Sequence, residues 1–251
     1  MKRILYILLV LTLTGCTAIE VRKTLKDVET YIAERPDSAL AVIESMDTTD
    51  LTTKGLRAHH ALLHAMALDK NYIDVTDDSL ALKAVNYYQK RGPRKNYARA
   101  LYYLALSYYY DKQYDKSIIE LSKAEPVAEK NDSLYWGFAK VLQASVYSRN
   151  YNEIAELEAL EEALQIYLKL DDEYYHIDAT SDSVELGGKY HTIHRYFNLN
   201  DIIQELALYV QHCKIEKYFK DIMISNILNN KPTSKIALKK FVAEYYSNIK
   251  S

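Results

Sequence analysis

Apolar residues recur three and four positions apart along almost the whole chain from Thr17 to Ser251, with short polar stretches between them. This spacing places apolar side chains on one face of an α-helix. The pattern predicts an all-α protein. We expect helices over residues 20–34, 37–46, 53–69, 78–91, 95–110, 115–130, 134–149, 153–170, 184–197, 200–213, 215–229 and 234–249.

Capping and turn residues separate these helices. Pro36-Asp37-Ser38 and Asp77-Asp78-Ser79 have the residue types that begin a helix, and Gly92-Pro93 ends the helix before it. The whole chain of 251 residues contains only 6 Gly and 4 Pro, which argues against an all-β sandwich or barrel. A hydrophobic fraction of 49% provides enough apolar material for a sizeable core.

One short turn sequence occurs three times. The copies are Asp69-Lys70-Asn71-Tyr72, Asp111-Lys112-Gln113-Tyr114 and Ser148-Arg149-Asn150-Tyr151, at spacings of 42 and 37 residues. Each copy lies between two amphipathic segments, so the repeated unit is a helical hairpin. A single hairpin has no partner for its apolar face and must stack on its neighbours.

The middle hairpin resembles a tetratricopeptide repeat over residues 95–130, and the resemblance extends more loosely over 53–170. The matching positions are Leu101, Leu104, Ala105, Tyr108, Tyr114, Ser117, Leu121 and Ala124. The resemblance implies a TPR-like α-solenoid of about five hairpins over residues 16–251, closed by a capping helix at 234–249. A generic helical bundle is the alternative.

Three features depart from that repeat. Pro126 comes three residues earlier than the repeat's usual proline, which predicts a kink in the second helix near Ala124. Lys140 and Gln143 stand in the third hairpin where large apolar residues are expected, and residues 73–78 form an insertion in the first hairpin.

The N-terminus has the pattern of a secretory signal: two basic residues precede a short apolar run that ends in Leu13-Thr14-Gly15-Cys16. This tetrapeptide resembles the lipobox of bacterial lipoproteins. The resemblance implies cleavage of residues 1–15 and acylation of Cys16, so that a lipid anchor holds the protein. Residues 17–22 lack the acidic cluster of surface-exported lipoproteins, which favours the periplasmic side of the outer membrane. An ordinary cleaved signal or a buried N-terminal helix is the alternative.

A second stripe on helix 95–110 is a candidate binding surface. Arg99, Tyr102, Leu106 and Tyr109 lie about 130° around the helix from the Leu101 stripe. In tetratricopeptide repeats the corresponding face lines a concave groove, and tyrosines with an arginine suit recognition of a peptide. The alternative is that these rings pack against the adjoining hairpin.

Other residues offer little chemistry. His60 and His64 have a spacing that could chelate a metal, but no third ligand is evident. Asp171-Asp172-Glu173 lies in a polar connector, where contact with solvent gives carboxylates no unusual reactivity. The balance of 32 basic and 34 acidic side chains argues against a nucleic-acid partner. Cys213 has no second cysteine to pair with once Cys16 is acylated. We therefore expect no enzyme activity, no metal and no cofactor.

These observations together predict a lipid-anchored protein of the bacterial cell envelope. Its expected role is that of a non-catalytic module that binds a protein or peptide partner of unknown identity. A glycan-binding lipoprotein that pairs with an outer-membrane transporter is the second hypothesis. An enzyme with a site near His60 and His64, or in the acidic stretch 171–178, is the third.

Overall fold

The computed structural model describes residues 18–173, 202–204, 206–214 and 217. The chain divides into two compact units, residues 1–207 and 208–251. All regular structure in the described residues is helical, which confirms the all-α prediction. The description below concerns the first unit.

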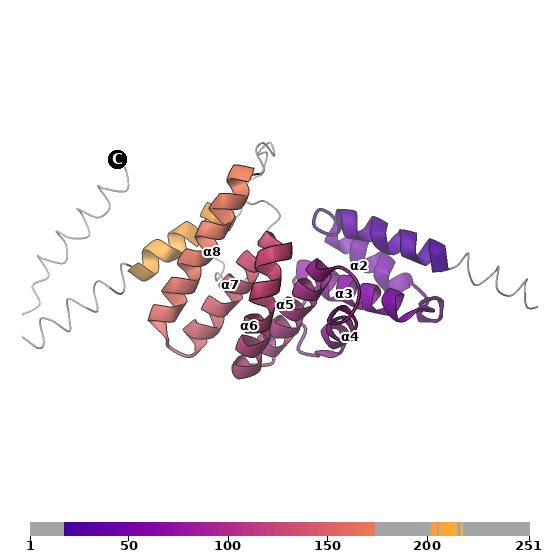
Figure 1. Ribbon diagram of the computed structural model, residues 1–251, viewed down its shortest axis with the longest axis horizontal. Coiled ribbons are helices and arrows are strands. Elements are labelled where there is room, and N and C mark those ends of the chain that lie inside the picture. The colour runs from indigo at the N-terminus through magenta and orange to yellow at the C-terminus, as the bar shows by residue number, and fades with distance from the viewer. Residues whose placement is uncertain (1–17, 174–201, 205, 215–216, 218–251) are drawn as a thin grey trace, which may run out of the picture. The chain divides into compact units, whose positions relative to one another are not determined.

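Helices follow one another with short connections in this unit (Figure 1). They run over 18–31, α2 Pro36–Ser45, α3 Lys54–Lys70, α4 Ser79–Tyr88, α5 Arg94–Tyr110, α6 Tyr114–Asn131, α7 Ser133–Arg149 and α8 Glu153–Glu173, with a 3-10 turn, η1, at Thr48–Asp50. The sequence-based helices from 20–34 to 153–170 are all present, with ends shifted by at most three residues. None of the helices described is long and apolar enough to cross a membrane.

Several predictions concern residues whose structure is not described. These are the signal segment 1–15, Cys16, the helix at 184–197, the helix at 215–229 except for residue 217, and the capping helix at 234–249. The predicted helix 200–213 is described in part, and residues 202–204 and 206–214 are helical.

Helices α2, α4 and α7 begin beside residues of the types that favour a helix start. Pro36 occupies the first position of α2, where its missing N–H costs no hydrogen bond. The Asp77 carboxylate accepts a hydrogen bond from the Ser79 N–H at 2.9 Å, just before α4. Asp132 accepts from the Tyr135 N–H at 3.4 Å and separates α6 from α7. α6 continues through Pro126 to Asn131 as one helix.

Helices α3, α5 and α7 end in the same backbone motif. A residue with left-handed backbone follows each helix: Tyr72 (φ 60°), Lys112 (φ 62°) and Tyr151 (φ 56°). The N–H of the next residue then reaches back to a carbonyl five residues earlier, at 3.0, 2.8 and 3.0 Å respectively. These are Schellman motifs, which satisfy the last carbonyls of a helix.

The motif corrects the alignment of the three turns. The left-handed residues are 40 and 39 residues apart, so Tyr72 and Tyr151 are equivalent positions, as predicted. Tyr114 is not equivalent to them, because it lies two residues after Lys112 and begins α6. The backbone conformation defines this corner, and the aromatic side chain shared by the three turns does not.

The helices form consecutive hairpins, α3–α4, α5–α6 and α7–α8. Each of these helices packs on the next in the sequence, and α5, the first helix of the middle hairpin, also packs on α3 and on α7. α5 therefore contacts α3, α4, α6 and α7. This position explains why α5 is buried on almost every side rather than along one stripe.

Small residues bring α5 and α6 close together. The Ser117 hydroxyl donates to the Ala105 carbonyl across this pair at 2.8 Å, and both residues are fully buried. Leu121 and Ala124 complete the buried face of α6. Small side chains at Ala105, Ser117 and Ala124 thus allow the two helices to approach closely.

The polar residues that departed from the repeat hold three helices together. Lys140 on α7 lies 2.5 Å from Glu125 on α6 and 2.6 Å from Glu162 on α8. The Gln143 side-chain amide also donates to Glu125, at 3.2 Å. Burial acts to lower the pKa of Lys140, but the two carboxylates outweigh it and raise that pKa. The ammonium is therefore charged in the folded protein at neutral pH.

Candidate binding cleft

The stripe predicted to line a groove is buried between hairpins. The exposed fractions of Tyr102, Leu106 and Tyr109 are 1%, 3% and 6%. The Tyr102 ring contacts the rings of Tyr135 and Phe138 on α7, with centroids 5.5 and 6.0 Å apart. The prediction of an open groove at these residues is therefore wrong. The physical reason is that α7 packs directly on this face of α5.

Arg99, the fourth member of the stripe, belongs to a network of charges. Its guanidinium lies 2.6 Å from Asp132, the N-cap of α7, and 3.4 Å from Glu29 on the N-terminal helix. Glu29 also lies 3.2 Å from the His59 ring and 3.7 Å from the Lys95 ammonium. The hydrogen bond with His59, helped by the charges of His59, Lys95 and Arg99, holds the pKa of Glu29 below its usual range despite burial.

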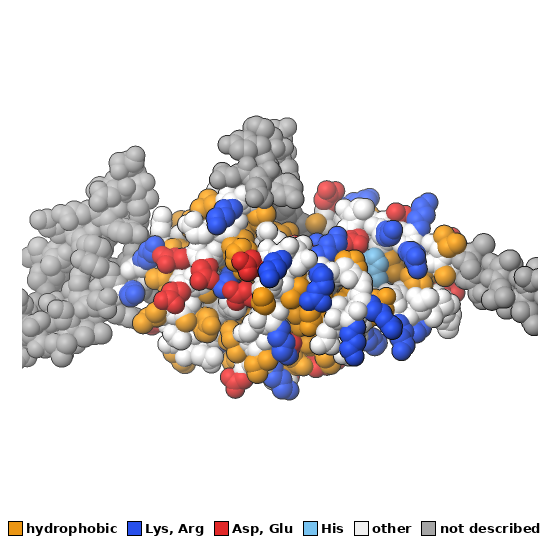
Figure 2. All heavy atoms as spheres, in the orientation of Figure 1, with side chains coloured by type: hydrophobic (Ala, Val, Ile, Leu, Met, Phe, Trp, Pro, Cys, Tyr) orange, Lys and Arg blue, Asp and Glu red, His pale blue; other side chains and the backbone are white. Residues whose placement is uncertain are grey.

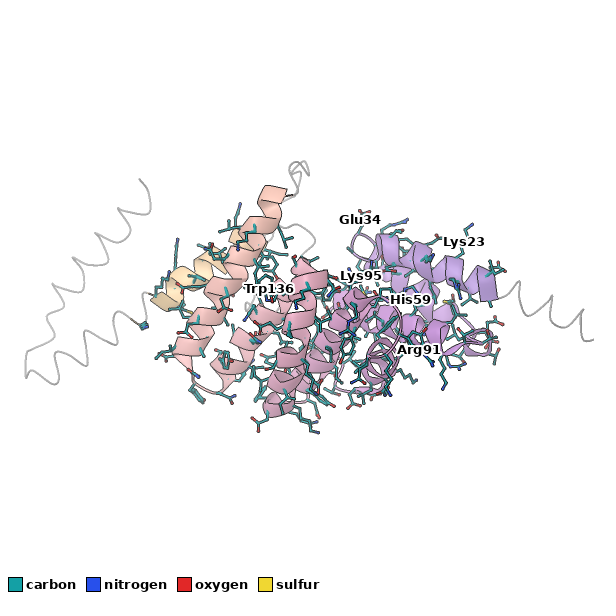
Figure 3. The ribbon with its side chains drawn as sticks, in the orientation of Figure 1. Lys23, Glu34, His59, Arg91, Lys95 and Trp136 are labelled. Carbon is teal, nitrogen blue, oxygen red and sulfur yellow. The ribbon has the colours of Figure 1, made fainter. Side chains whose placement is uncertain are left out.

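A cleft of about 780 Å³ opens beside this network. Three elements form its walls: the N-terminal helix, the first turns of α3, and the connection from the end of α4 to the start of α5. Figure 3 labels one of its residues on α3, His59, one in the α4–α5 connection, Arg91, and one on α5, Lys95. The network around Glu29 thus connects the N-terminal helix to α3 and α5 along the cleft.

The charged side chains of the cleft are nearly all basic. They are Arg22, Lys26, Lys54, Arg91 and Lys95, with His59, against the single carboxylate of Glu29. Arg22, Lys26, Lys54 and Arg91 are exposed, and none of them pairs with a carboxylate in the described part of the chain. In Figure 2, Lys and Arg side chains gather toward the α3–α5 side of the visible face, and Asp and Glu gather over α6–α8.

Two helix N-termini add to the positive potential. α3 and α5 both begin in the cleft, and neither has an acidic residue in its first turn. α5 also lacks a side-chain cap, because Pro93 occupies its N-cap position. The unpaired N–H groups at a helix start carry a partial positive charge and attract anions.

Aromatic rings supply an apolar part of the wall. Tyr87 is half-buried and its hydroxyl lies over Gly55, where a Cβ would be only 2.8 Å from it. Tyr88 packs against Gly92, which has the left-handed φ of 83° that this tight connection requires. The two rings meet edge to face, with centroids 5.3 Å apart. The cleft combines cations with a tyrosine surface.

The two histidines have separate hydrogen-bonding and charged partners. His60 hydrogen-bonds the Ile43 carbonyl at 3.1 Å, and His64 lies 3.7 Å from Glu44. Burial, together with the neighbouring His60, lowers the pKa of His64. Among the described residues no group of three or more His, Cys, Asp or Glu side chains is placed to hold a metal ion. Asp171-Asp172-Glu173 forms the end of α8, and Cys213 is half-buried.

Sequence reasoning missed the cleft because its cations come from separate elements. The one local signal was the spacing of Arg22, Lys26 and Glu29, which places all three on one face of the N-terminal helix. Lys54 and Arg91 join that face only through tertiary packing. Comparisons of the chain with protein-family models, curated proteins and solved structures found no match.

Proposed function

We propose that this protein is a lipid-anchored, non-catalytic binding module of the bacterial cell envelope. Acylated Cys16 holds it on the periplasmic side of the outer membrane, and a TPR-like array of stacked helical hairpins forms its body. The partner is a protein or peptide that binds in the basic cleft, rather than at the buried stripe of Arg99, Tyr102, Leu106 and Tyr109.

Three observations support a TPR-like array. The hairpins α3–α4, α5–α6 and α7–α8 follow one another, and their first helices pack side by side. Equivalent turns recur at 40 and 39 residues, somewhat longer than the repeat of about 34 residues typical of tetratricopeptide repeats. The small residues Ala105 and Ser117 let α5 and α6 pack closely in the middle hairpin.

The observation that carries the binding proposal is the set of unpaired cations in the cleft. Arg22, Lys26, Lys54 and Arg91 repel one another, and none of them forms an ion pair with a carboxylate in the described part of the chain. An anionic partner relieves the repulsion and gains the attraction of the helix N-termini. Such a surface supports fast, oriented association more than catalysis.

A photo-crosslinking experiment in intact cells tests the location of the site. A photoreactive amino acid is placed at Tyr87 in the cleft and, as a control, at Tyr151, which is 91% exposed on another hairpin. We expect a discrete adduct from position 87 that disappears with Lys54→Glu. Identical adducts from both positions, or none from position 87, would contradict the proposal.

A second experiment tests the anchor. Cys16→Ser should release the protein from the membrane fraction and abolish its labelling by palmitate, whereas the wild-type chain should stay bound through a high-salt wash. A Cys16→Ser protein that remains in the membrane fraction would contradict lipid anchoring.

A glycan ligand is the second candidate, because the half-buried Tyr87 places a ring in the cleft and sugars stack on such rings. Glycan-array binding that is lost in Tyr87→Ala would favour this candidate over a protein partner.

A further inference from the structure

We infer that the basic cleft recognises an acidic segment of a polypeptide, with two or more carboxylates spread along an extended chain. This inference rests on the proposed function, because it names the ligand of the same cleft. It is carried by charge complementarity, by the convergence of two helix N-termini, and by the shape of the walls.

The charges are arranged for more than one anionic group. Arg22 and Lys26 lie one helical turn apart on the N-terminal helix, whereas Lys54 and Arg91 lie on two other elements across the cleft. Because the cations come from different walls, one small anion satisfies only part of the set. Several carboxylates along a chain can pair with all the walls together.

The single carboxylate in the cleft does not oppose such a ligand. Glu29 is already held by His59, Lys95 and Arg99, at 3.2, 3.7 and 3.4 Å. Its charge is therefore compensated within the wall. The cations that remain, Lys54 and Arg91 among them, determine the sign of the potential that a ligand meets.

Uncharged side chains of the walls also shape the site. Asn96 is 5% exposed and its side chain hydrogen-bonds Tyr88, so it belongs to the wall and is not open to a ligand. The half-buried Tyr87 ring offers an apolar contact for a side chain beside the acidic groups.

The concave shape also favours a chain over a membrane surface. Lipid headgroups of a flat bilayer meet protruding cations first, whereas this cleft sets cations on three walls around a volume of about 780 Å³. An extended polypeptide enters such a volume and places side chains on alternate sides.

The probe for this inference is fluorescein-labelled octaglutamate, and octaglutamine is its uncharged counterpart. Binding to the full-length protein in a non-ionic detergent is followed by fluorescence anisotropy. We expect saturable binding of octaglutamate, weaker when NaCl is raised from about 50 to about 300 mM, and much weaker binding of octaglutamine.

Matched variants locate the binding. Lys54→Gln with Arg91→Gln removes two cleft charges, and Lys116→Gln with Lys130→Gln removes two exposed charges from α6. We expect the cleft pair to weaken octaglutamate binding about tenfold or more and the α6 pair to change it less than about twofold. Circular dichroism of both double variants checks that the substitutions leave the fold unchanged.

The outcomes separate this inference from the proposed function. Equal weakening by both pairs, or no saturable octaglutamate binding, would overturn the acidic-peptide assignment. If the Tyr87 crosslink persists in cells under those results, the cleft still binds a partner and only the ligand class is wrong. Vesicles of phosphatidylglycerol are a further arm: binding to them that depends on Lys54 and Arg91, without octaglutamate binding, would assign the cleft to a membrane instead.

Discussion

Replacing Tyr102 by alanine tests whether the predicted groove stripe is a core or a surface. The side chain is 1% exposed and is surrounded by rings: Tyr103 at 5.1 Å, Tyr135 at 5.5 Å and Phe138 at 6.0 Å between centroids. Removal of the ring leaves a cavity between α5 and α7. It also deletes edge-to-face contacts with two of these rings.

The size of the effect follows from that environment. Truncation of a buried aromatic residue to alanine costs about 3–5 kcal/mol. A domain of this size loses about 2–4 °C of melting temperature per kcal/mol. Tyr102→Ala should therefore lower the melting temperature by about 6–20 °C. The cost of about 3–5 kcal/mol is a large fraction of a typical free energy of unfolding of about 5–15 kcal/mol.

Urea unfolding followed by far-UV circular dichroism measures the free energy of unfolding. Tyr151→Ala is the matched control, because Tyr151 is 91% exposed and its loss should change that free energy by less than about 0.5 kcal/mol. If Tyr102→Ala also costs less than about 1 kcal/mol, the ring is not packed between hairpins. The stripe would then be available as a groove, as the sequence pattern suggested.

Three further outcomes follow from local geometry. Lys112→Gly should stabilise the chain by about 0.5–1 kcal/mol, because the φ of 62° strains any residue that has a Cβ. Lys112→Ala keeps a Cβ and should not stabilise it, so equal urea midpoints for the two variants would contradict this reasoning. Gly137→Ala should destabilise by about 1–3 kcal/mol or more in the same assay, since its Cβ would lie 2.5 Å from Cζ of the Tyr167 ring; an unchanged midpoint would show that the α7–α8 contact is loose. The free energy of unfolding should fall above pH 10, because burial raises the pKa of Tyr135 to about 12 and the unfolded chain releases the proton first. The slope is about 1.4 kcal/mol per pH unit for each such tyrosine, and urea midpoints that do not move between pH 9 and 11 would contradict it.

Local chemistry made the helices predictable. Caps such as Asp77 and Asp132 act within a few residues of the helix they begin, so the sequence alone locates the helix starts. The resemblance to a tetratricopeptide repeat likewise indicated packing positions at Ala105, Ser117 and Leu121, and all three are buried. The Schellman turns were recognised as repeats but misaligned by two residues at Tyr114, because side-chain similarity does not report backbone conformation.

The groove and the cleft were not predictable for a different reason. Helical spacing separates one face of α5 from another, but it does not say how many neighbours the helix has. Tyr102 and Leu106 are buried because α7 covers their face, and only the tertiary arrangement shows this. In the same way, Lys54 and Arg91 are ordinary surface residues in sequence and become a site only when three elements meet.

The cluster at Lys140 shows how a departure from the repeat can specify the packing. Apolar side chains at positions 140 and 143 would pack against α6 and α8 in several registers. The Lys140 ammonium and the Gln143 amide are satisfied only when Glu125 of α6 and Glu162 of α8 both face them. Because Lys140 is buried and pairs with both carboxylates, a register that separates it from them leaves its charge unpaired, so alternative registers of these three helices are penalised. We infer that the cluster sets the alignment of α7 between its neighbours, while the surrounding apolar contacts supply most of the stability.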